Sequence, residues 1–293
     1  SAMVYEFTDL QGIAGEYYAK HDGEADEVAK AMSEQYLPKF AGDALPATNT
    51  GALIAISDRI DTIAGIFGLG QTPTGSKDPF GLRRASIAVL RILVEKNLDL
   101  DLKTLLEKAI SQYADLPKGD STLPVALDYM LERFKAWYGE AGIPAEVFQA
   151  VSAKALSCPL DIDNRVQAVN AFRQLPEAPA LAEANKRVSN ILAKQDESPA
   201  TTVDDALLDI DAEKTLAKEV ASLREEVAPL FAKADYKQAL QVLARLQKPV
   251  DAFFTDVMVM TDDIAVRNNR LALLQQLRDL FAEVADISCL VVK

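Results

Sequence analysis

Apolar residues recur along this chain at alternating intervals of three and four positions, which is the spacing of one face of an α-helix. Between residues 53 and 67 they are Leu53, Ile56, Ile60, Ile63 and Phe67, and charged residues occupy positions between them. Such a stripe makes a helix amphipathic, so the helix is stable only when this face packs against neighbours. Alternating patterns typical of β-strands are missing, apart from the short CLVV sequence at residues 289–292. The sequence therefore predicts an all-α protein.

Further stripes of the same spacing predict helices along the rest of the chain, roughly a dozen in all. Their members are Ile87, Leu90 and Val94; Leu127, Leu131, Phe134 and Tyr138 after Pro124; Leu181, Val188, Ile191 and Leu192; and Leu273, Leu274, Leu277, Leu280, Phe281 and Val284.

The chain length and the interruptions of this pattern predict two domains. With 293 residues, the chain is long enough to bury two hydrophobic cores. A Cys-Pro turn interrupts the helical pattern at residues 157–163, so we place the boundary near Ser157, between domains of residues 1–157 and 158–293. Residues 196–211 are acidic and contain no basic residue, which predicts a solvated loop.

Charge limits the partners that the protein can bind. The formal net charge is −13 and the pI is about 4.7, so the long-range field repels nucleic acid. Any contact with RNA must come from local clusters of basic residues. No apolar run approaches the roughly 20 residues that span a bilayer, and no signal peptide is evident, so we expect a soluble, cytoplasmic protein without a membrane partner.

The two cysteines, Cys158 and Cys289, lie far apart in the sequence and lack the spacing of metal ligands. We expect each to be a buried or inert thiol, which fits a reducing compartment.

The stretch PTGSKDPFGLRR, residues 73–84, reverses the sign of the charge locally through Lys77, Arg83 and Arg84. Residues 75 and 76 predict a turn. Asp78 predicts the N-cap of a helix whose first residue is Pro79 and which continues from Phe80. Unpaired N–H groups, the helix dipole and these cations would then face one anion, such as a phosphate. An ordinary helix cap whose arginines pair with acidic side chains remains the alternative.

This stretch is not a nucleotide-binding P-loop. Gly70 and Gly75 have the required separation, but Ser76 precedes Lys77, where the motif needs lysine followed by serine or threonine. The segment also follows a predicted helix rather than a strand, and Pro73 removes one N–H group from the loop. Phosphate contact by another geometry remains possible.

The basic stretch belongs to a much longer run that resembles a known family. The similar segments are FTDLQGIAGEYYAKHDGE (7–24), EQYLPKFAGDALP (34–46), ISDRIDTIAGIFGLGQTPTGSKDPFGLRRASIAVLRI (56–92), NKRVSNILAK (185–194) and FFTDVMVMTDDIAVRNNRLALLQQLRDLFAEVADIS (253–288). Together they are similar to the bacterial glycyl-tRNA synthetase β subunit. That subunit is considerably longer and begins well upstream, so the resemblance identifies the chain as its C-terminal part.

The resemblance implies an HD-like helical domain, incomplete at its N-terminus, followed by a DALR-type anticodon-binding helical bundle. It implies that the β subunit recognises glycine tRNA, whereas a separate α subunit adenylates glycine with ATP and Mg²⁺ and transfers it. The expected partners are glycine tRNA and the α subunit, in a heterotetramer of two α and two β subunits. We expect no cofactor in this part of the enzyme.

His21 and Asp22 invite comparison with metal-dependent HD phosphohydrolases, whose sites need several histidines and aspartates around the metal. This chain has one histidine, and Asp58 and Asp61 are the only plausible further carboxylates, so no competent metal shell is expected. His21 is then a surface or capping residue. Because no serine or cysteine has a histidine to activate it, we expect no catalytic residues in this chain.

Arg187, Asn190 and Lys194 are spaced i, i+3 and i+7, which places them on one flank of a helix. From the residues themselves the simplest interpretation is a solvated helix face. Because NKRVSNILAK resembles the opening helix of DALR-type domains, the resemblance implies that these residues contact the anticodon, whose unpaired bases expose their edges.

Arg267 is a further candidate for contact with the anticodon, because it precedes the last apolar stripe and does not share its face. Arg270 projects on the apolar side, where a guanidinium should be paired. We expect Arg270 to be structural, with Asp256, Asp262 or Asp263 as its partner. The same aspartates suit the N-terminal cap of this helix.

Two other functions remain open at this point. A helical scaffold that holds subunits together without touching RNA would suit the acidic surface. A residual HD-type phosphohydrolase would instead release phosphate in a metal-dependent reaction.

Overall fold

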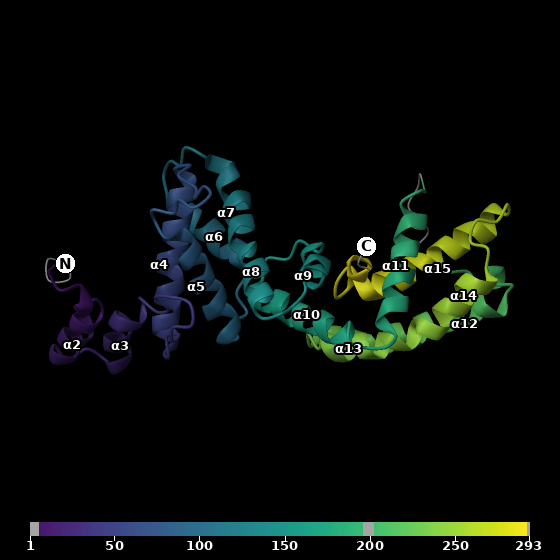
Figure 1. Cartoon of the computed structure of the whole chain (residues 1–293), viewed down its shortest axis with the longest axis horizontal. Coiled ribbons are helices and arrows are strands. Elements are labelled where there is room, and N and C mark those ends of the chain that lie inside the picture. Colours follow the sequence, from purple (N-terminus) through teal and green to yellow (C-terminus); the bar gives the residue numbers. More distant parts are fainter. Residues whose placement is uncertain (1–5, 196–201, 292–293) are drawn as a thin grey trace. The chain divides into compact units, whose positions relative to one another are not determined.

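The computed structural model describes residues 6–195 and 202–291, which form helices joined by turns (Figure 1). The predicted all-α class is confirmed, because these residues contain no β-strand and one isolated bridge, between Thr74 and Lys77. In chain order the helices are η1 (Thr8–Leu10), α2 (Ile13–His21), α3 (Asp26–Glu34), α4 (Asn49–Gly68), α5 (Leu82–Glu95), α6 (Leu102–Ile110), η2 (Gly119–Ser121), α7 (Thr122–Leu131), α8 (Arg133–Glu140), α9 (Ala145–Ser152), α10 (Pro159–Phe172), α11 (Ala178–Leu192), η3 (Asp205–Leu207), α12 (Asp211–Ala232), α13 (Tyr236–Leu243), η4 (Ala244–Leu246), α14 (Gln247–Asp256), α15 (Ile264–Ala282) and η5 (Ile287–Leu290).

The chain divides into two compact units. The first contains the residues up to Ala136 together with Ser157–Leu160, and the second contains Trp137–Leu156 together with the residues from Asp161 onward. The two units therefore exchange short segments around residue 157. The domain boundary near Ser157 lies within this exchange and remains a prediction.

The first unit is built around α4, which packs against α3, α5, α6 and α7. Ile56, Ile60, Ile63 and Phe67 of the predicted stripe are buried, as their spacing requires. Leu53, at the same periodicity, is 51% exposed, whereas Ala52 and Ala55 beside it are buried, so at this end of α4 the buried face lies to one side of the predicted stripe.

The start of α4 explains a glycine of this unit. The Thr48 hydroxyl accepts a hydrogen bond from the Gly51 N–H at 3.0 Å, and the buried Glu34 carboxylate accepts from the N–H groups of Ala47 and Thr48, each at 3.1 Å. A Cβ atom at Gly51 would lie 2.2 Å from a carboxylate oxygen of Glu34. Glycine is required here because the carboxylate of α3 approaches the backbone of α4 so closely.

Two predicted stripes, one in the first unit and one that runs from it into the second, differ from the buried faces. In α5, Leu90 is fully buried, whereas Ile87 and Val94 are half-buried, and Val89 and Leu93 complete the inner face. The stripe predicted from 127 to 138 is divided between α7 and α8, so that it does not form one helix face. Packing on two sides broadens the buried face of a helix beyond a single stripe.

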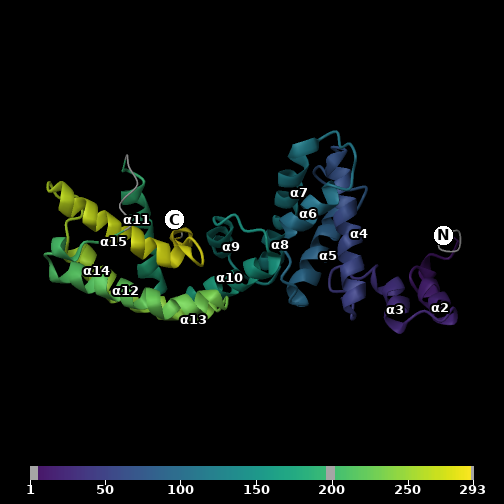
Figure 2. The same ribbon diagram turned by 180° about the vertical axis from the view of Figure 1, so that it is seen from behind.

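The second unit packs α11 against α14, α15 and η5, and α12 against α13, α14 and α15. The long helices α12 and α15 can be followed in green and yellow from both sides (Figures 1 and 2). The stripe predicted for the last helix is confirmed, because all six of its members are buried: Leu273, Leu274, Leu277, Leu280, Phe281 and Val284.

Arg270 is structural, as expected, but its predicted partner is wrong. Its Nε donates to the Glu213 carboxylate of α12, and Nη1 donates to the Met258 carbonyl at 2.8 Å. The two side chains are 9% and 0% exposed. The same Glu213 carboxylate also accepts from the N–H groups of Asp209 and Ile210, each at 3.1 Å. These bonds fix the carboxylate at the start of α12, where Arg270 reaches it.

Asp263 instead serves as the cap of α15, which confirms the local role expected for these aspartates. Its carboxylate accepts from the N–H groups of Ala265 at 2.9 Å and Val266 at 3.2 Å.

The segment predicted as a solvated loop is only partly loop-like. Residues 196–201 lie outside the described residues. From residue 202 onward, η3 forms, Leu208 is 6% exposed, and Asn269 of α15 exchanges hydrogen bonds with the Asp204 backbone at 2.7 and 2.9 Å. The other residues from 202 to 210 are mostly exposed and irregular, so the predicted loop is confirmed there, except that Leu208 is buried and a side chain distant in sequence bonds the Asp204 backbone.

The CLVV segment is not a strand over its described residues. Cys289 and Leu290 end η5, and the segment has no partner strand in the part of the chain that is described. Val292 lies outside that part.

Candidate nucleic-acid interface

Helix α11 carries the predicted anticodon residues. Its inner face buries Leu181, Val188 and Leu192, so the flank with Arg187 and Asn190 faces outward, and Lys194 follows in the turn after the helix. All three candidate side chains are exposed. The local spacing of the sequence thus predicts correctly that the three share one side of α11.

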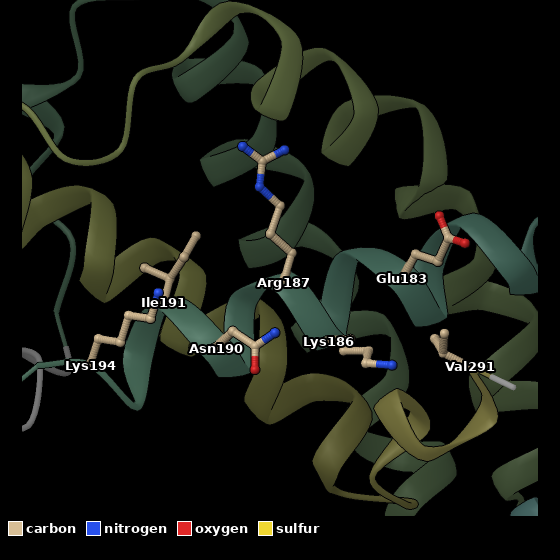
Figure 3. Close-up of a pocket in the computed structure, with 7 residues that line it drawn as sticks. All are labelled: Glu183, Lys186, Arg187, Asn190, Ile191, Lys194 and Val291. Carbon is tan, nitrogen blue, oxygen red and sulfur yellow. The ribbon is translucent and has the colours of Figure 1, made fainter. Parts of the chain in front are cut away.

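These residues line one shallow hollow of about 450 Å³ (Figure 3). Arg187 and Ile191 project on one side of α11, and Lys186 and Asn190 leave it on the adjacent side (Figure 3). The full lining is Glu183, Lys186, Arg187, Asn190, Ile191, Lys194 and Val291. Three cations against one carboxylate make the hollow locally positive, in a chain whose net charge is −13.

The guanidinium of Arg187 lies over an aromatic ring of another helix. Its Cζ is 4.3 Å from the centroid of the Phe254 ring, which belongs to α14. Arg187 takes part in no ion pair within residues 6–195 and 202–291. The Arg187 guanidinium therefore makes a cation–π contact with Phe254, and no carboxylate of the described residues neutralises its charge.

Lys186 and Phe254 belong to this site, although sequence reasoning did not select them. Lys186 lies four positions before Asn190, so helical spacing could have identified it. Phe254 carries no comparable signal, because its proximity to Arg187 depends on the packing of α14 against α11.

Arg267 does not line the hollow. It lies in the first turn of α15 and is half-buried. Its contact with RNA remains a prediction.

The basic stretch of the first unit has the predicted turn. Thr74 and Lys77 exchange backbone hydrogen bonds at 3.1 and 2.9 Å around Gly75 and Ser76. The predicted helix start at Pro79 is wrong, because α5 begins at Leu82. Gly81, with a φ of +66°, adopts a left-handed conformation that delays the helix.

Asp78 still caps α5, although it lies four residues before Leu82, the first residue of the helix. Its carboxylate accepts from the N–H groups of Leu82 at 2.8 Å and Arg83 at 3.0 Å. The N–H groups that were expected to face an external anion are therefore already bonded to Asp78. This corrects the predicted geometry of the phosphate site at the helix terminus.

The cations of this stretch remain accessible. Lys77 and Arg84 are exposed, and Arg83 is half-buried and donates to the Gly75 carbonyl. None of the three is in an ion pair with a described residue. The alternative in which the arginines pair with acidic side chains is thus not what the structure shows, and their contact with phosphate remains a prediction.

His21 lies at the end of α2, where it is exposed and 3.5 Å from Asp22. It is a surface residue, as expected. No group of three or more His, Cys, Asp or Glu side chains that could hold a metal was found among the described residues. No helix in the described ranges is long and apolar enough to cross a membrane.

Both cysteines are half-buried thiols. The Cys158 Sγ lies 3.3 Å from an Asp99 carboxylate oxygen. Burial raises the pKa of the Cys289 thiol, which disfavours its reactive thiolate form.

Comparison with known families identifies the domain that carries the α11 hollow. Residues 181–287 match the DALR anticodon binding domain, and this range contains Arg187, Asn190, Lys194 and Arg267. The second unit therefore carries an anticodon-binding domain, the class of domain with which tRNA synthetases recognise tRNA. Residues 1–153 match the family described as the glycyl-tRNA synthetase beta subunit, and this range contains Lys77, Arg83 and Arg84. The chain belongs to this glycyl-tRNA synthetase beta subunit family.

Similar curated proteins are glycine–tRNA ligase beta subunits. The sequence is 59% identical to that of Marinobacter nauticus over 289 residues and 57% identical to that of Chromohalobacter salexigens over 286 residues. It is 56% identical to that of Pseudomonas aeruginosa over 288 residues. In each case the match covers 98% of this chain and 42% of the relative.

Proposed function

We propose that this chain is the tRNA-recognition portion of a glycine–tRNA ligase β subunit, which binds glycine tRNA and positions it for aminoacylation by the α subunit. The observation that carries the proposal is the α11 hollow, where Arg187, Asn190 and Lys194 are exposed together inside the range that matches an anticodon-binding domain. An amide and two cations on one helix flank can contact both base edges and phosphates of a single-stranded loop.

The first unit has a separate role in this proposal. Lys77, Arg83 and Arg84 would contact phosphates elsewhere on the tRNA and so orient it without reading its sequence. The exposure of Lys77 and Arg84, and the freedom of all three cations from ion pairs in the described part of the chain, support this role.

The catalytic steps belong to the α subunit in this proposal. In the same proposal the β subunit acts in the cytoplasm within a heterotetramer of two α and two β subunits, and ATP and Mg²⁺ are used on α. The chain itself would then contribute binding and positioning, and no catalytic residue.

The experiment compares glycine tRNA with the same tRNA carrying a substituted anticodon. We expect the triple variant Arg187→Ala, Asn190→Ala, Lys194→Ala to weaken binding of glycine tRNA by at least about tenfold, because it removes groups that bind base edges as well as groups that bind phosphates. Binding of the substituted tRNA should weaken less, because that tRNA does not present the bases that these groups recognise. Equilibrium binding of labelled tRNA to the full chain measures both effects.

A matched control removes two lysines from other helices of the same unit. Lys218 and Lys237 are exposed on α12 and α13, so Lys218→Ala, Lys237→Ala changes the net charge by the same two units as the triple variant. Equal weakening for both tRNAs in the triple variant would contradict anticodon contact. Unchanged binding of both would favour a scaffold that does not touch RNA.

A further inference from the structure

The contact between Arg187 and Phe254 indicates how the proposed site is organised, and the inference drawn from it rests on the function proposed above. The guanidinium centre lies 4.3 Å from the ring centroid, so one face of Arg187 is covered by an aromatic ring. Arg187 is nevertheless an exposed residue. Its opposite face and its N–H donors are therefore directed to solvent.

A covered guanidinium differs from a free one in its conformational freedom. A solvated arginine samples many rotamers, and ordering such a side chain on binding costs conformational entropy. Contact with an aromatic face restricts those rotamers while leaving the in-plane N–H donors unused. The contact with Phe254 thus prepares Arg187 for binding before a ligand arrives.

Phe254 belongs to a helix that is packed into the core of the second unit. The neighbouring Phe253 is fully buried, and the two rings meet edge to face with centroids 5.5 Å apart. Helix α14, which carries both rings, packs against α11 and α12. The ring position is therefore set by the core of the second unit.

The surroundings of Arg187 suit a flat ligand with hydrogen-bonding edges. Ile191 lies four positions further along α11 and adds an apolar contact, and Asn190 supplies an amide that both donates and accepts. Lys194 adds a positive charge at the end of the same hollow. An unpaired nucleobase with its phosphate combines a π-face, polar edges and a negative charge.

We propose that Phe254 is a positioning residue that holds the guanidinium of Arg187 as a stacking platform for an unpaired base of an RNA loop. A base within a duplex is stacked on both sides and would not fit this arrangement. Phe254 acts through Arg187 and need not touch the RNA itself.

A double-mutant cycle tests this coupling in the full chain. We expect Phe254→Leu to weaken binding of glycine tRNA by roughly three- to tenfold, and Arg187→Ala to weaken it by about tenfold or more. The double variant should bind no more weakly than Arg187→Ala, because Phe254 has no further arginine to hold. Phe254→Tyr, which keeps the aromatic face, should retain binding within about twofold.

The control is Phe231→Leu, which alters another half-buried phenylalanine of the same unit at a position away from the hollow. It should leave tRNA binding unchanged, and thermal melts should show that Phe254→Leu remains folded. Additive effects in the double variant would overturn the positioning role, as would normal binding by Phe254→Leu when Arg187→Ala is impaired. If Arg187→Ala and the triple variant both bind normally, the proposed function itself fails.

Discussion

At the scale of single residues, Arg270 and Arg187 of the second unit differ in the surroundings of their guanidinium groups. Arg270 is buried against Glu213, whereas Arg187 is exposed over Phe254 and has no carboxylate partner in the described part of the chain. A buried charge without its partner is costly, so Arg270 serves stability. An exposed cation without a carboxylate partner is available for binding, which is the role that the proposed function assigns to Arg187.

The buried pair predicts a large effect on stability. We expect Arg270→Met to lower the free energy of unfolding by about 3–5 kcal/mol, because Glu213 is left buried without its counter-charge. Urea unfolding followed by circular dichroism measures this decrease. The second variant, Arg270→Met with Glu213→Gln, should recover part of it, because the amide carries no charge and can still accept from the N–H groups that start α12.

The matched control for this prediction is Arg245→Met, which breaks the exposed pair with Glu226. Its side chains are 54% and 44% exposed, so we expect a decrease of about 1 kcal/mol or less. If Arg270→Met were as mild as this control, the buried pair would not be the stabilising contact that its geometry indicates.

At the scale of elements, the two basic surfaces differ in how their helices present them. The cations of helix α11 lie along its outer flank, where they line the hollow. Helix α5 places Arg83 and Arg84 in its first turn, beside a carboxylate that already binds its N–H groups. Asp78 therefore stabilises α5 and also opposes the approach of a phosphate to the neighbouring cations.

This arrangement predicts that a charge-neutral cap strengthens binding. Each oxygen of Asp78 accepts one N–H group of α5, so Asp78→Asn keeps one of the two cap hydrogen bonds, and we expect the free energy of unfolding to fall by about 1 kcal/mol. If Lys77, Arg83 and Arg84 contact phosphates, glycine tRNA should bind several-fold more tightly to this variant, because a repulsive charge is gone. Equilibrium binding at low salt measures the increase in affinity.

Asp26→Asn is the control, because it removes one exposed carboxylate from the first turn of another helix of the same unit, α3. An equal increase in both variants would show that the effect comes from net charge and not from the basic stretch.

At the scale of the whole molecule, a net charge of −13 opposes the local attraction that the proposed function needs. The two contributions respond differently to salt. Screening weakens the attraction between cations and phosphates, because counterions are no longer released with the same favourable entropy. Screening also relieves the long-range repulsion between two polyanions.

The sign of the salt dependence therefore decides which contribution dominates. We expect the association constant for glycine tRNA to fall as salt rises from about 50 to about 200 mM, as it does for proteins that neutralise phosphates. Replacing Lys77, Arg83 and Arg84 with alanine should flatten this slope by roughly one unit for each phosphate that is no longer neutralised. An association constant that rises with salt would mean that repulsion dominates and that these cations do not bind the tRNA.

Features that depend on neighbours along one helix could be predicted from the sequence. The buried stripe of α15 and the shared flank of Arg187, Asn190 and Lys194 follow from a repeat of 3.6 residues, which any helix imposes. Resemblance along the chain also identified the family correctly, because the similar segments are long and specific.

Contacts between segments distant in sequence could not be predicted without the packing of the helices. Glu213 as the partner of Arg270, Asn269 as the partner of the Asp204 backbone, and Phe254 beneath Arg187 all depend on which helices pack together. The start of α5 depended in turn on the conformation of Gly81 and the reach of Asp78. Periodicity specifies which face of a helix is buried, but it does not specify which residue lies opposite, because that choice is made by packing.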